Sequence, residues 1–299
     1  MIYDSIVIGA GAAGMTAALN VLRNGKTVLV LEKELIGGQI ANSPRVENYP
    51  SIREISGEQF STNLFDQIVS LGAEFELEEV LKVEKQADVF KVTTDYNTYE
   101  SKTVVIASGS EHNHLNVDGE DLKGVSYCAL CDGAFYKGEE IAVIGDANTA
   151  LQYALLLSNY AKTVHFCMLF DKFFGDKILV DRLLDKENVE VYKNISLEKI
   201  NGSTQVESLD FIGRVDDTLK INIKVKAVFV AIGQSPHTEI FKDLVERDER
   251  GYIITDENMK TKTDGLYAIG DVRTKSVRQL TTAVADAAIA AFNISKDLS

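Results

Sequence analysis

Residues 4–14 read Asp4-Ser5-Ile6-Val7-Ile8-Gly9-Ala10-Gly11-Ala12-Ala13-Gly14, an apolar strand that runs into a glycine-rich turn. The turn has the spacing G-x-G-x-x-G, and an apolar-periodic helix is predicted after it, over residues 12–24. In such a unit the glycines allow a tight turn, let a pyrophosphate approach the backbone and let the helix pack on the strand. The stretch therefore predicts a dinucleotide-binding α/β unit.

The sequence beyond this helix supports the same prediction. A strand over residues 27–31 ends at Glu32, about twenty residues after the turn, where a carboxylate can accept a hydrogen bond from a ribose hydroxyl. Residues 37–40, Gly-Gly-Gln-Ile, and then Asn48 offer close backbone approach and amides to a flat ring. An ordinary surface loop would have the same composition, so this second signal is weaker.

Two strands end in a glycine, and we interpret them as the crossings between two domains. Residues 73–106 alternate as strands and turns and lead into Ala107-Ser108-Gly109. Residues 227–232 repeat the pattern, with Gly233 as the stop. Before the first of these, residues 56–71 are predicted to form a helix that Ser56 caps, with Gln59 completing a capping box.

A second doubly wound unit is predicted from a strand over 140–145, a helix over 149–160 and a strand over 163–167. Its turn, Gly145-Asp146-Ala147, keeps one glycine and adds a carboxylate that would face a pyrophosphate. Like charges a few ångströms apart repel by on the order of a few kcal/mol at an effective dielectric of about 20. Residues 168–172, Met-Leu-Phe-Asp-Lys, lack the arginines that would bind a ribose phosphate. Nucleotide binding here is predicted to be damaged.

The stretch Cys128-Ala129-Leu130-Cys131-Asp132-Gly133 can close a small disulfide ring with a proton donor beside it. Structural zinc is the main alternative, but it needs four ligands, and the chain has only 3 cysteines and no histidine pair with ligand spacing. The pattern favours a redox pair. The remaining cysteine, Cys167, lies in an apolar run and is predicted to be a buried core residue.

Near the C-terminus, residues 265–272 form a short predicted strand that delivers Asp271 at its end. Such an acid can hold the ribitol chain of a flavin, and a helix that begins near Thr281 would direct its N-terminus at the ring. Arg278 and Gln279, just before this helix, are candidates to contact a cofactor or the other domain. A plain packing helix remains an alternative.

Composition sets limits on the class of protein. At 299 residues the chain suits about two domains of roughly 100 to 200 residues each. The net charge of -14 disfavours nucleic acid and anionic membranes as partners. No apolar run approaches the roughly 18 residues of a membrane span, and no signal segment follows Met1, so we expect a cytoplasmic protein.

Together these motifs resemble the low-molecular-weight thioredoxin reductase family of flavoproteins over essentially the whole chain. The resemblance implies an α/β fold of two Rossmann-like (doubly wound, three-layer) domains, the second inserted into the first. Residues 1–112 and 241–299 would bind FAD, and residues 113–240 would carry the disulfide. Thioredoxin would be the partner, and the family usually forms homodimers through the FAD domain.

The resemblance also implies roles for individual residues. Cys131 would face the flavin, Cys128 would exchange with thioredoxin, and Asp132 would serve as the acid; no metal is implied. The expected FAD contacts are Gly9, Gly11, Ala12, Ala13, Gly14, Glu32, Lys33, Gly38, Gln39, Ile40, Asn48, Ala107, Ser108, Gly109, Gly270, Asp271, Arg278, Gln279 and Leu280.

Family members that use NADPH have a glycine-rich turn where this chain has Asp146 and Ala147. In this respect the chain resembles the pyridine-nucleotide-independent branch of the family, the flavin-type ferredoxin-thioredoxin reductases. A flavin can accept electrons one at a time from an iron-sulfur donor and give two to a disulfide. Because ferredoxins are commonly acidic, docking would need a basic patch, either Lys172, Lys177 and Arg182 or Arg273, Lys275 and Arg278. Two alternatives stay open: an NAD(P)H-dependent thioredoxin reductase with an atypical nucleotide site, and a flavin redox sensor without turnover.

Overall fold

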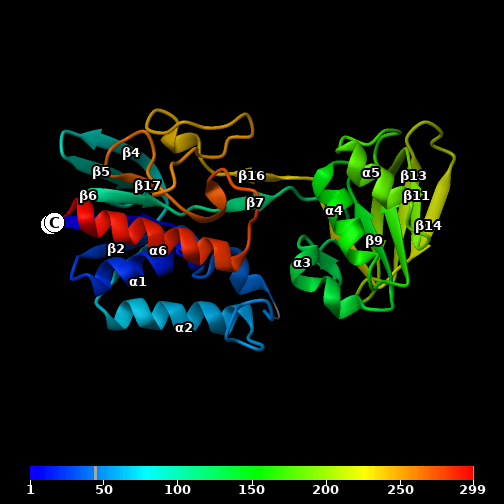
Figure 1. Cartoon of the computed structure of the whole chain (residues 1–299), viewed down its shortest axis with the longest axis horizontal. Coiled ribbons are helices and arrows are strands. Elements are labelled where there is room, and N and C mark those ends of the chain that lie inside the picture. The colour runs from blue at the N-terminus through cyan, green and yellow to red at the C-terminus, as the bar shows by residue number, and fades with distance from the viewer. Residues whose placement is uncertain (44–45, 299) are drawn as a thin grey trace. The chain divides into compact units, whose positions relative to one another are not determined.

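The computed structural model describes residues 1–43 and 46–298, which form two compact units (Figure 1). Unit 1 comprises Met1–Glu111 and Ser235–Ser299, and unit 2, His112–Gln234, is inserted into it. The chain crosses between them on β7 (Ser110–His112) and β16 (Gln234–Pro236), which pair with each other. The second crossing lies earlier than the predicted boundary at 240/241, because residues before 241 already bond to unit 1: the His237 carbonyl accepts from Ser108, and the Thr238 hydroxyl donates to the Gly251 carbonyl.

The main sheet of unit 1 has the order β3-β2-β1-β6-β5-β4, with β17 paired to β6. The parallel strands are β1 (Ile2–Ile8), β2 (Val28–Glu32), β3 (Glu74–Leu77), β6 (Thr98–Ile106) and β17 (Leu266–Ala268). The strands β4 (Val80–Gln86) and β5 (Val89–Thr94) continue from β6 as an antiparallel meander. The start of β6 pairs with β5 and its end pairs with β17, so one long strand serves two layers.

Three helices cover one face of this sheet: α1 (Ala12–Arg23), α2 (Gly57–Ser70) and α6 (Leu280–Asp297). Small residues on α1 and α6 allow the two helices to pack closely against each other. The other face is covered by β4, β5 and residues 241–253. Two 3-10 turns, η1 (Gly38–Asn42) and η4 (Gly270–Val272), follow β2 and β17, and η3 (Glu239–Phe241) follows β16.

The helix α2 begins as the sequence predicts. The Ser56 hydroxyl accepts a hydrogen bond from the Gln59 backbone N–H at 3.1 Å, which is one half of a capping box. The Gln59 side chain instead donates to Asn63 at 2.8 Å. Only the serine half of the predicted box is therefore formed.

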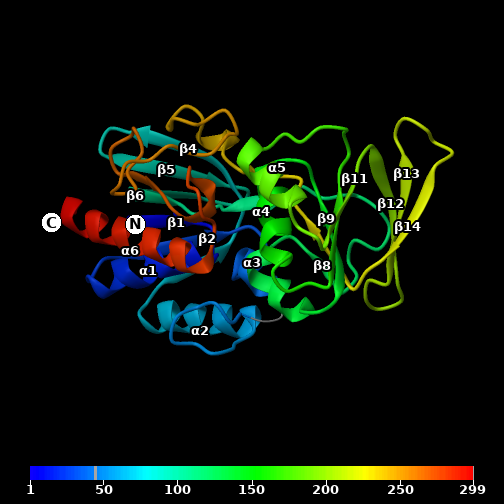
Figure 2. The same ribbon diagram turned by 45° about the vertical axis from the view of Figure 1, so that its right-hand side comes forward.

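Unit 2 is built around five parallel strands in the order β11-β10-β9-β15-β8 (Figure 2). They are β8 (Val125–Ser126), β9 (Glu140–Ile144), β10 (Thr163–Cys167), β11 (Val189–Tyr192) and β15 (Ala227–Val230). One face carries α3 (Ala129–Asp132), η2 (Gly133–Tyr136), α4 (Asn148–Leu157) and α5 (Lys177–Leu184). The other face packs against an antiparallel sheet of β12 (Ile195–Asn201), β13 (Ser208–Gly213) and β14 (Lys220–Lys224).

The predicted α/β class with two Rossmann-like units is confirmed. In both units the third layer is an antiparallel β-meander rather than a second layer of helices. None of the helices within residues 1–43 and 46–298 is long and apolar enough to cross a membrane. The same residues contain no cluster of three or more His, Cys, Asp or Glu side chains that could hold a metal ion.

Candidate active site

The glycine turn of unit 1 is shaped by close contacts at two of its three glycines. Gly9 has φ +105°, and a Cβ there would lie 2.5 Å from the carbonyl oxygen of Ala107. A Cβ on Gly14 would lie 1.9 Å from the Gly9 carbonyl oxygen. A Cβ on Gly11 would meet only the Gly37 carbonyl oxygen, at 3.9 Å. The turn therefore leaves open space at Gly11, where a pyrophosphate approaches in such motifs.

Three strands far apart in the sequence bring further predicted residues to this turn. The Ala107 N–H donates to the Ile8 carbonyl at 2.8 Å, and the Ile269 N–H donates to the Ile106 carbonyl at 3.0 Å. Gly270 has φ +72°, and a Cβ on it would lie 2.9 Å from the Cβ of Ala13. The carboxyl ends of β1, β6 and β17 thus gather in one place, which is where ligands bind in open α/β sheets.

Glu32 holds the turn from the end of β2. Its carboxylate accepts from the Ala10 N–H at 2.7 Å and from the Glu34 N–H at 3.0 Å. A carboxylate has about four acceptor positions, so capacity remains for a ribose hydroxyl. Lys33 is half exposed and lies 3.1 Å from the Glu34 carboxylate.

Asp271 carries a buried acceptor atom that is free to bind a cofactor. Its Oδ1 atom is buried and has no hydrogen-bond partner among the described residues. Burial raises the pKa of this carboxyl, and the Lys275 and Arg278 cations partly oppose that shift. Buried polar atoms in native proteins are nearly always paired. An orphaned acceptor beside the glycine turn fits a cofactor hydroxyl, so the residues present suit a flavin dinucleotide.

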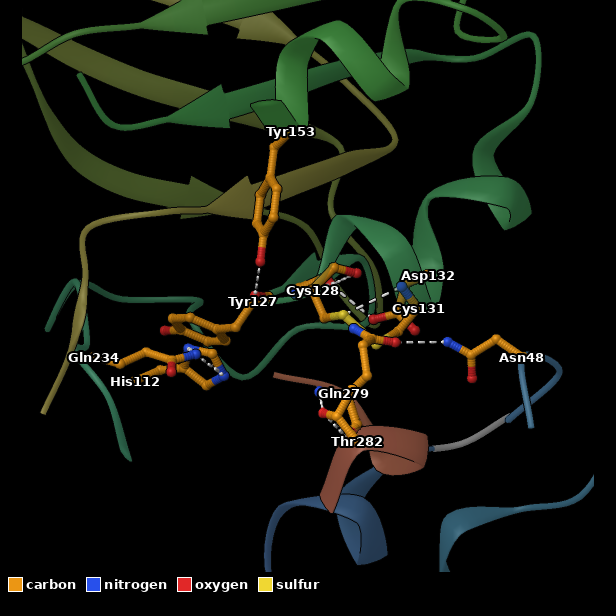
Figure 3. Close-up of a disulfide and its surroundings, with 11 residues drawn as sticks. Asn48, His112, Tyr127, Cys128, Cys131, Asp132, Tyr153, Gln234, Gln279 and Thr282 are labelled. Atoms are coloured by element: carbon orange, nitrogen blue, oxygen red, sulfur yellow. Dashed lines mark hydrogen bonds between the residues drawn. A yellow bond between two sulfur atoms is a disulfide. The ribbon is translucent and has the colours of Figure 1, made fainter. Parts of the chain in front are cut away.

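The polar side chains that the sequence also assigned to the cofactor make hydrogen bonds within unit 1. Gln39 donates to the Ser110 carbonyl, Asn48 donates to the Gln279 side-chain oxygen at 3.0 Å, and Ser108 donates to the His237 carbonyl at 3.2 Å. Gln279 also forms a capping box at the start of α6 with Thr282 (Figure 3). These residues have structural roles that the sequence did not reveal.

The remaining predicted contacts lie around the turn and the start of α6. Arg278 stacks on the Tyr252 ring at 4.0 Å and donates to the Asp271 carbonyl at 3.4 Å. The others are backbone or apolar positions: Ala12 and Ala13 in the first turn of α1, Gly38 and Ile40 in η1, Ala107 and Gly109 after β6, and Leu280 at the start of α6.

We expect Asp271→Asn to weaken FAD binding by roughly 10- to 100-fold, the cost of losing a hydrogen bond to a charged group, about 1.5–3 kcal/mol. Titration of the apoprotein with FAD measures this loss of affinity.

Because the pKa of Asp271 is raised, the wild-type apoprotein loses stability as pH rises above the ordinary carboxyl range. The variant should therefore gain relative stability from acid to neutral pH. Unchanged FAD affinity would contradict the assignment.

In unit 2, Cys128 and Cys131 form a disulfide with a Cα–Cα distance of 5.3 Å (Figure 3). Cys128 precedes α3 as its N-cap residue, and its sulfur accepts from the Cys131 N–H at 3.2 Å. Residues three positions apart lie on the same side of a helical turn, so the C-x-x-C spacing brings the two sulfurs together in this short helix.

Asp132 lies at the end of α3, beside the disulfide. Burial raises the pKa of its carboxyl, and a hydrogen bond from Ser126 at 2.7 Å opposes the shift. A carboxyl with a raised pKa can hold a proton closer to neutral pH than an exposed aspartate. This environment suits a proton donor for a thiolate.

A polar network adjoins the disulfide on its N-terminal side. The Tyr127 hydroxyl donates to Glu120, and its ring stacks on His112 at 5.0 Å. His112 in turn contacts Gln234, and the Tyr153 hydroxyl donates to the Tyr127 carbonyl at 3.0 Å (Figure 3). Sequence reasoning missed Ser126 and Tyr127, although both directly precede Cys128. No local signal could have found His112 and Gln234.

The turn of the second unit differs from the first in the features that would bind a nucleotide. Ala147, the N-cap of α4, carries a methyl group at the position that Gly11 leaves open. Burial raises the pKa of Asp146 in the same turn. Asn148 is engaged by Asp176, accepting from its backbone N–H at 2.7 Å and donating to its carboxylate at 3.1 Å. Two carboxylates therefore flank the start of this helix.

One of the two predicted basic patches does not exist as an exposed surface. Arg273 and Lys275 lie 3.3 Å and 2.8 Å from the carboxylate of Asp286, and all three side chains are largely buried. Asp286 also accepts from the Gly270 N–H at 3.0 Å, so these ions fix the loop that carries Asp271. This internal pairing has no signal in the local pattern of basic residues.

The other predicted patch is altered rather than lost. Lys177 is neutralised by Asp181 at 2.7 Å, and Arg182 is exposed in the last turn of α5. Lys172 lies over the Phe174 ring at 5.0 Å, and Arg214 lies over the Phe170 ring at 4.9 Å. Among the described residues neither Lys172 nor Arg214 has a carboxylate partner. Arg214 donates to the Leu169 carbonyl at 3.2 Å. The exposed surface therefore combines aromatic rings with two cations that no carboxylate among the described residues neutralises.

Comparison with known proteins agrees with this arrangement. The pyridine nucleotide-disulphide oxidoreductase family matches residues 3–287. A thioredoxin reductase of Listeria innocua is 39% identical over 99% of this chain and 93% of its own. A 34.2 kDa protein in the rubredoxin operon of Clostridium pasteurianum is 37% identical over 98% of this chain and 96% of its own. The crystal structure of thioredoxin reductase from Streptococcus pyogenes, 36% identical, superposes with a TM-score of 0.95 over 99% of this chain and 98% of that one.

The chain thus belongs to the pyridine nucleotide-disulphide oxidoreductase family. Within it, the chain is a member of the low-molecular-weight thioredoxin reductase group.

Proposed function

We propose that this protein binds FAD and passes electrons from reduced ferredoxin, through the flavin and the Cys128–Cys131 disulfide, to thioredoxin. The disulfide with an acid beside it supports the thiol chemistry. The orphaned Asp271 acceptor beside the glycine turn supports the cofactor. When bound, the flavin would supply the exchange between single electrons and an electron pair.

The chain's own residues then have defined roles. Gly11, Glu32 and Asp271 would hold the phosphates and hydroxyl groups of the cofactor. By analogy with the family, Cys131 would exchange electrons with the flavin and Cys128 would exchange with thioredoxin. Asp132 donates a proton to the sulfur that leaves as a thiolate when the disulfide is reduced, and it takes the proton back when the dithiol is spent.

The observation that carries the choice of donor is the start of α4. Asp146 and Asp176 flank the position where a dinucleotide would place its phosphates, and Ala147 fills the space that a glycine would leave. Repulsion between these carboxylates and a pyrophosphate disfavours NADPH and NADH. A protein donor needs no such site.

Electrostatics restrict where an acidic donor can bind to a chain of net charge -14. The cations Lys172 and Arg214 lie over the exposed rings of Phe174 and Phe170 and provide a local surface that attracts carboxylates. We assign the ferredoxin contact to this patch.

The deciding experiment is anaerobic reduction of the purified holoenzyme, followed by the bleaching of flavin absorbance. We expect rapid bleaching by catalytically reduced ferredoxin and none by NADPH or NADH at millimolar concentration. Lys172→Glu combined with Arg214→Glu should slow the ferredoxin reaction about tenfold or more at low salt. Lys177→Glu is the matched control, since Asp181 already neutralises that cation.

Other outcomes select the alternatives. Rapid bleaching by a pyridine nucleotide would replace ferredoxin with NAD(P)H as the donor and would leave the disulfide chemistry intact. Slow disulfide reduction with every donor would favour a flavin redox sensor. If the flavin-containing protein reduces another disulfide but not thioredoxin, only the proposed partner is wrong. A cytoplasmic location and a homodimer remain predictions.

A further inference from the structure

Ser126 links the nucleophile and the acid across the disulfide loop. It lies at the end of β8, is 5% exposed, and precedes Cys128 by two residues. Its hydroxyl donates to Asp132 Oδ2 at 2.7 Å and accepts from the Cys128 N–H at 3.1 Å. The Cys128 carbonyl oxygen lies 3.4 Å from the same hydroxyl.

We propose that Ser126 is a positioning residue that holds the Asp132 carboxyl beside the disulfide and sets the pH at which this acid exchanges its proton. The proposal rests on the acid role of Asp132 proposed above. It adds a residue to the proton-transfer machinery, because nothing in the C-x-x-C-D motif itself includes position 126.

A serine hydroxyl suits this position because it has one hydrogen to donate and two lone pairs to accept with. When Asp132 is ionised, Ser126 donates to it while accepting from the Cys128 N–H. When Asp132 is protonated, its O–H can donate to the second lone pair of Ser126, and the serine hydrogen can turn to the Cys128 carbonyl. Both protonation states are thus hydrogen-bonded without movement of the carboxyl.

The surroundings of Asp132 leave this task to Ser126. Tyr136 and Tyr153 are the other titratable side chains that the described structure couples to Asp132; burial raises the pKa of each, and the carboxylate adds to that shift. The Tyr153 hydroxyl is committed to the Tyr127 carbonyl. Among the described residues, Ser126 is the side chain that hydrogen-bonds the Asp132 carboxyl.

The reaction that this arrangement serves is thiol–disulfide exchange. The Cys128 thiolate attacks a substrate disulfide, an S–S bond forms as the substrate S–S bond breaks, and the departing sulfur takes the electron pair and a proton. The Cys131 thiolate then attacks Cys128, restores the protein disulfide, and releases the second substrate sulfur, which takes the second proton. Both protons come from the two protein thiols, and Asp132 carries them in transit.

The test follows thiol reactivity rather than turnover. The holoenzyme is reduced with dithiothreitol, freed of reductant anaerobically, and alkylated with iodoacetamide across a pH series, with the modified cysteine identified by mass spectrometry. Asp132 and the thiol titrate as a coupled pair, so the profile has two inflections. Ser126→Ala should move the lower inflection upward by about one pH unit, because the ionised carboxyl loses its hydrogen bond. Ser126→Thr keeps the hydroxyl and should retain the wild-type profile.

Two further variants separate this proposal from the role of Asp132. Asp132→Asn should remove the lower inflection, and adding Ser126→Ala to that variant should change nothing more. A wild-type profile for Asp132→Asn would overturn the acid role itself. If Asp132→Asn alters the profile while Ser126→Ala does not, or if Ser126→Ala shifts it equally in the Asp132→Asn background, the positioning role is wrong and the acid role stands.

Discussion

Gly14→Ala is expected to destabilise unit 1 by about 3 kcal/mol or more and to yield a protein that does not retain FAD. The new methyl would lie 1.9 Å from the Gly9 carbonyl oxygen and 3.1 Å from a Val7 methyl. Both contacts are with rigid core structure, so the helix α1 would have to move away from β1. Thermal unfolding and the flavin absorbance of the purified protein measure the effect.

Gly11→Ala is the matched control for this prediction. A Cβ at position 11 meets only the Gly37 carbonyl oxygen, at the ordinary distance of 3.9 Å. The apoprotein should therefore unfold at the wild-type temperature, while the methyl group occupies space meant for a pyrophosphate and weakens FAD binding at least about tenfold. Equal stability of both apoproteins, or wild-type FAD affinity for Gly11→Ala, would contradict the assignment of the turn.

Replacing either Cys128 or Cys131 with serine is expected to lower thioredoxin reduction by on the order of a thousandfold or more, while the flavin is still bleached by its donor. The two sulfurs act as one unit, since exchange needs an attacking thiolate and a second thiol to resolve the mixed disulfide. Single-turnover reduction of thioredoxin and flavin absorbance, recorded together, separate the two steps.

Cys167→Ala provides the control for the cysteine variants. Cys167 is 2% exposed on β10, and burial raises the pKa of its thiol, so it is unreactive. This variant should keep full thioredoxin reduction, and native thiol titration of the reduced wild-type protein should find Cys128 and Cys131 alone. Significant activity in either serine variant would show that the disulfide is not on the electron path.

The sequence predicted those parts of the site that are encoded within a few residues. The strand and glycine turn over residues 4–14 form the expected unit, because glycine spacing alone sets the tight turn and the helix start. The Cys128–Cys131 disulfide follows from its spacing for the same reason. Cys167 is the predicted buried cysteine. In each case the local backbone conformation determines the geometry.

Other expectations depended on partners distant in the chain. Arg273 and Lys275 look like surface cations in the sequence, yet Asp286 on α6 pairs with both. Residues 235–240 were predicted to belong to the inserted domain, but His237 and Thr238 form hydrogen bonds with Ser108 and Gly251 of unit 1. Neither the ion pairs nor the domain boundary has a local signal, because the charge or hydrophobicity of a residue does not specify which distant residue it will contact.

By itself, the sequence determined the dinucleotide turn, the redox pair with its acid, and the two-unit α/β organisation, since these depend on short-range backbone geometry and residue periodicity. Only the tertiary structure decided that Asp271 is a buried, unpaired acceptor beside that turn, and that Ser126 shares its hydroxyl between Cys128 and Asp132. The physical reason is that the packing of strands and helices decides which polar atoms are buried and which partners they have. The order of residues along the chain does not specify those partners.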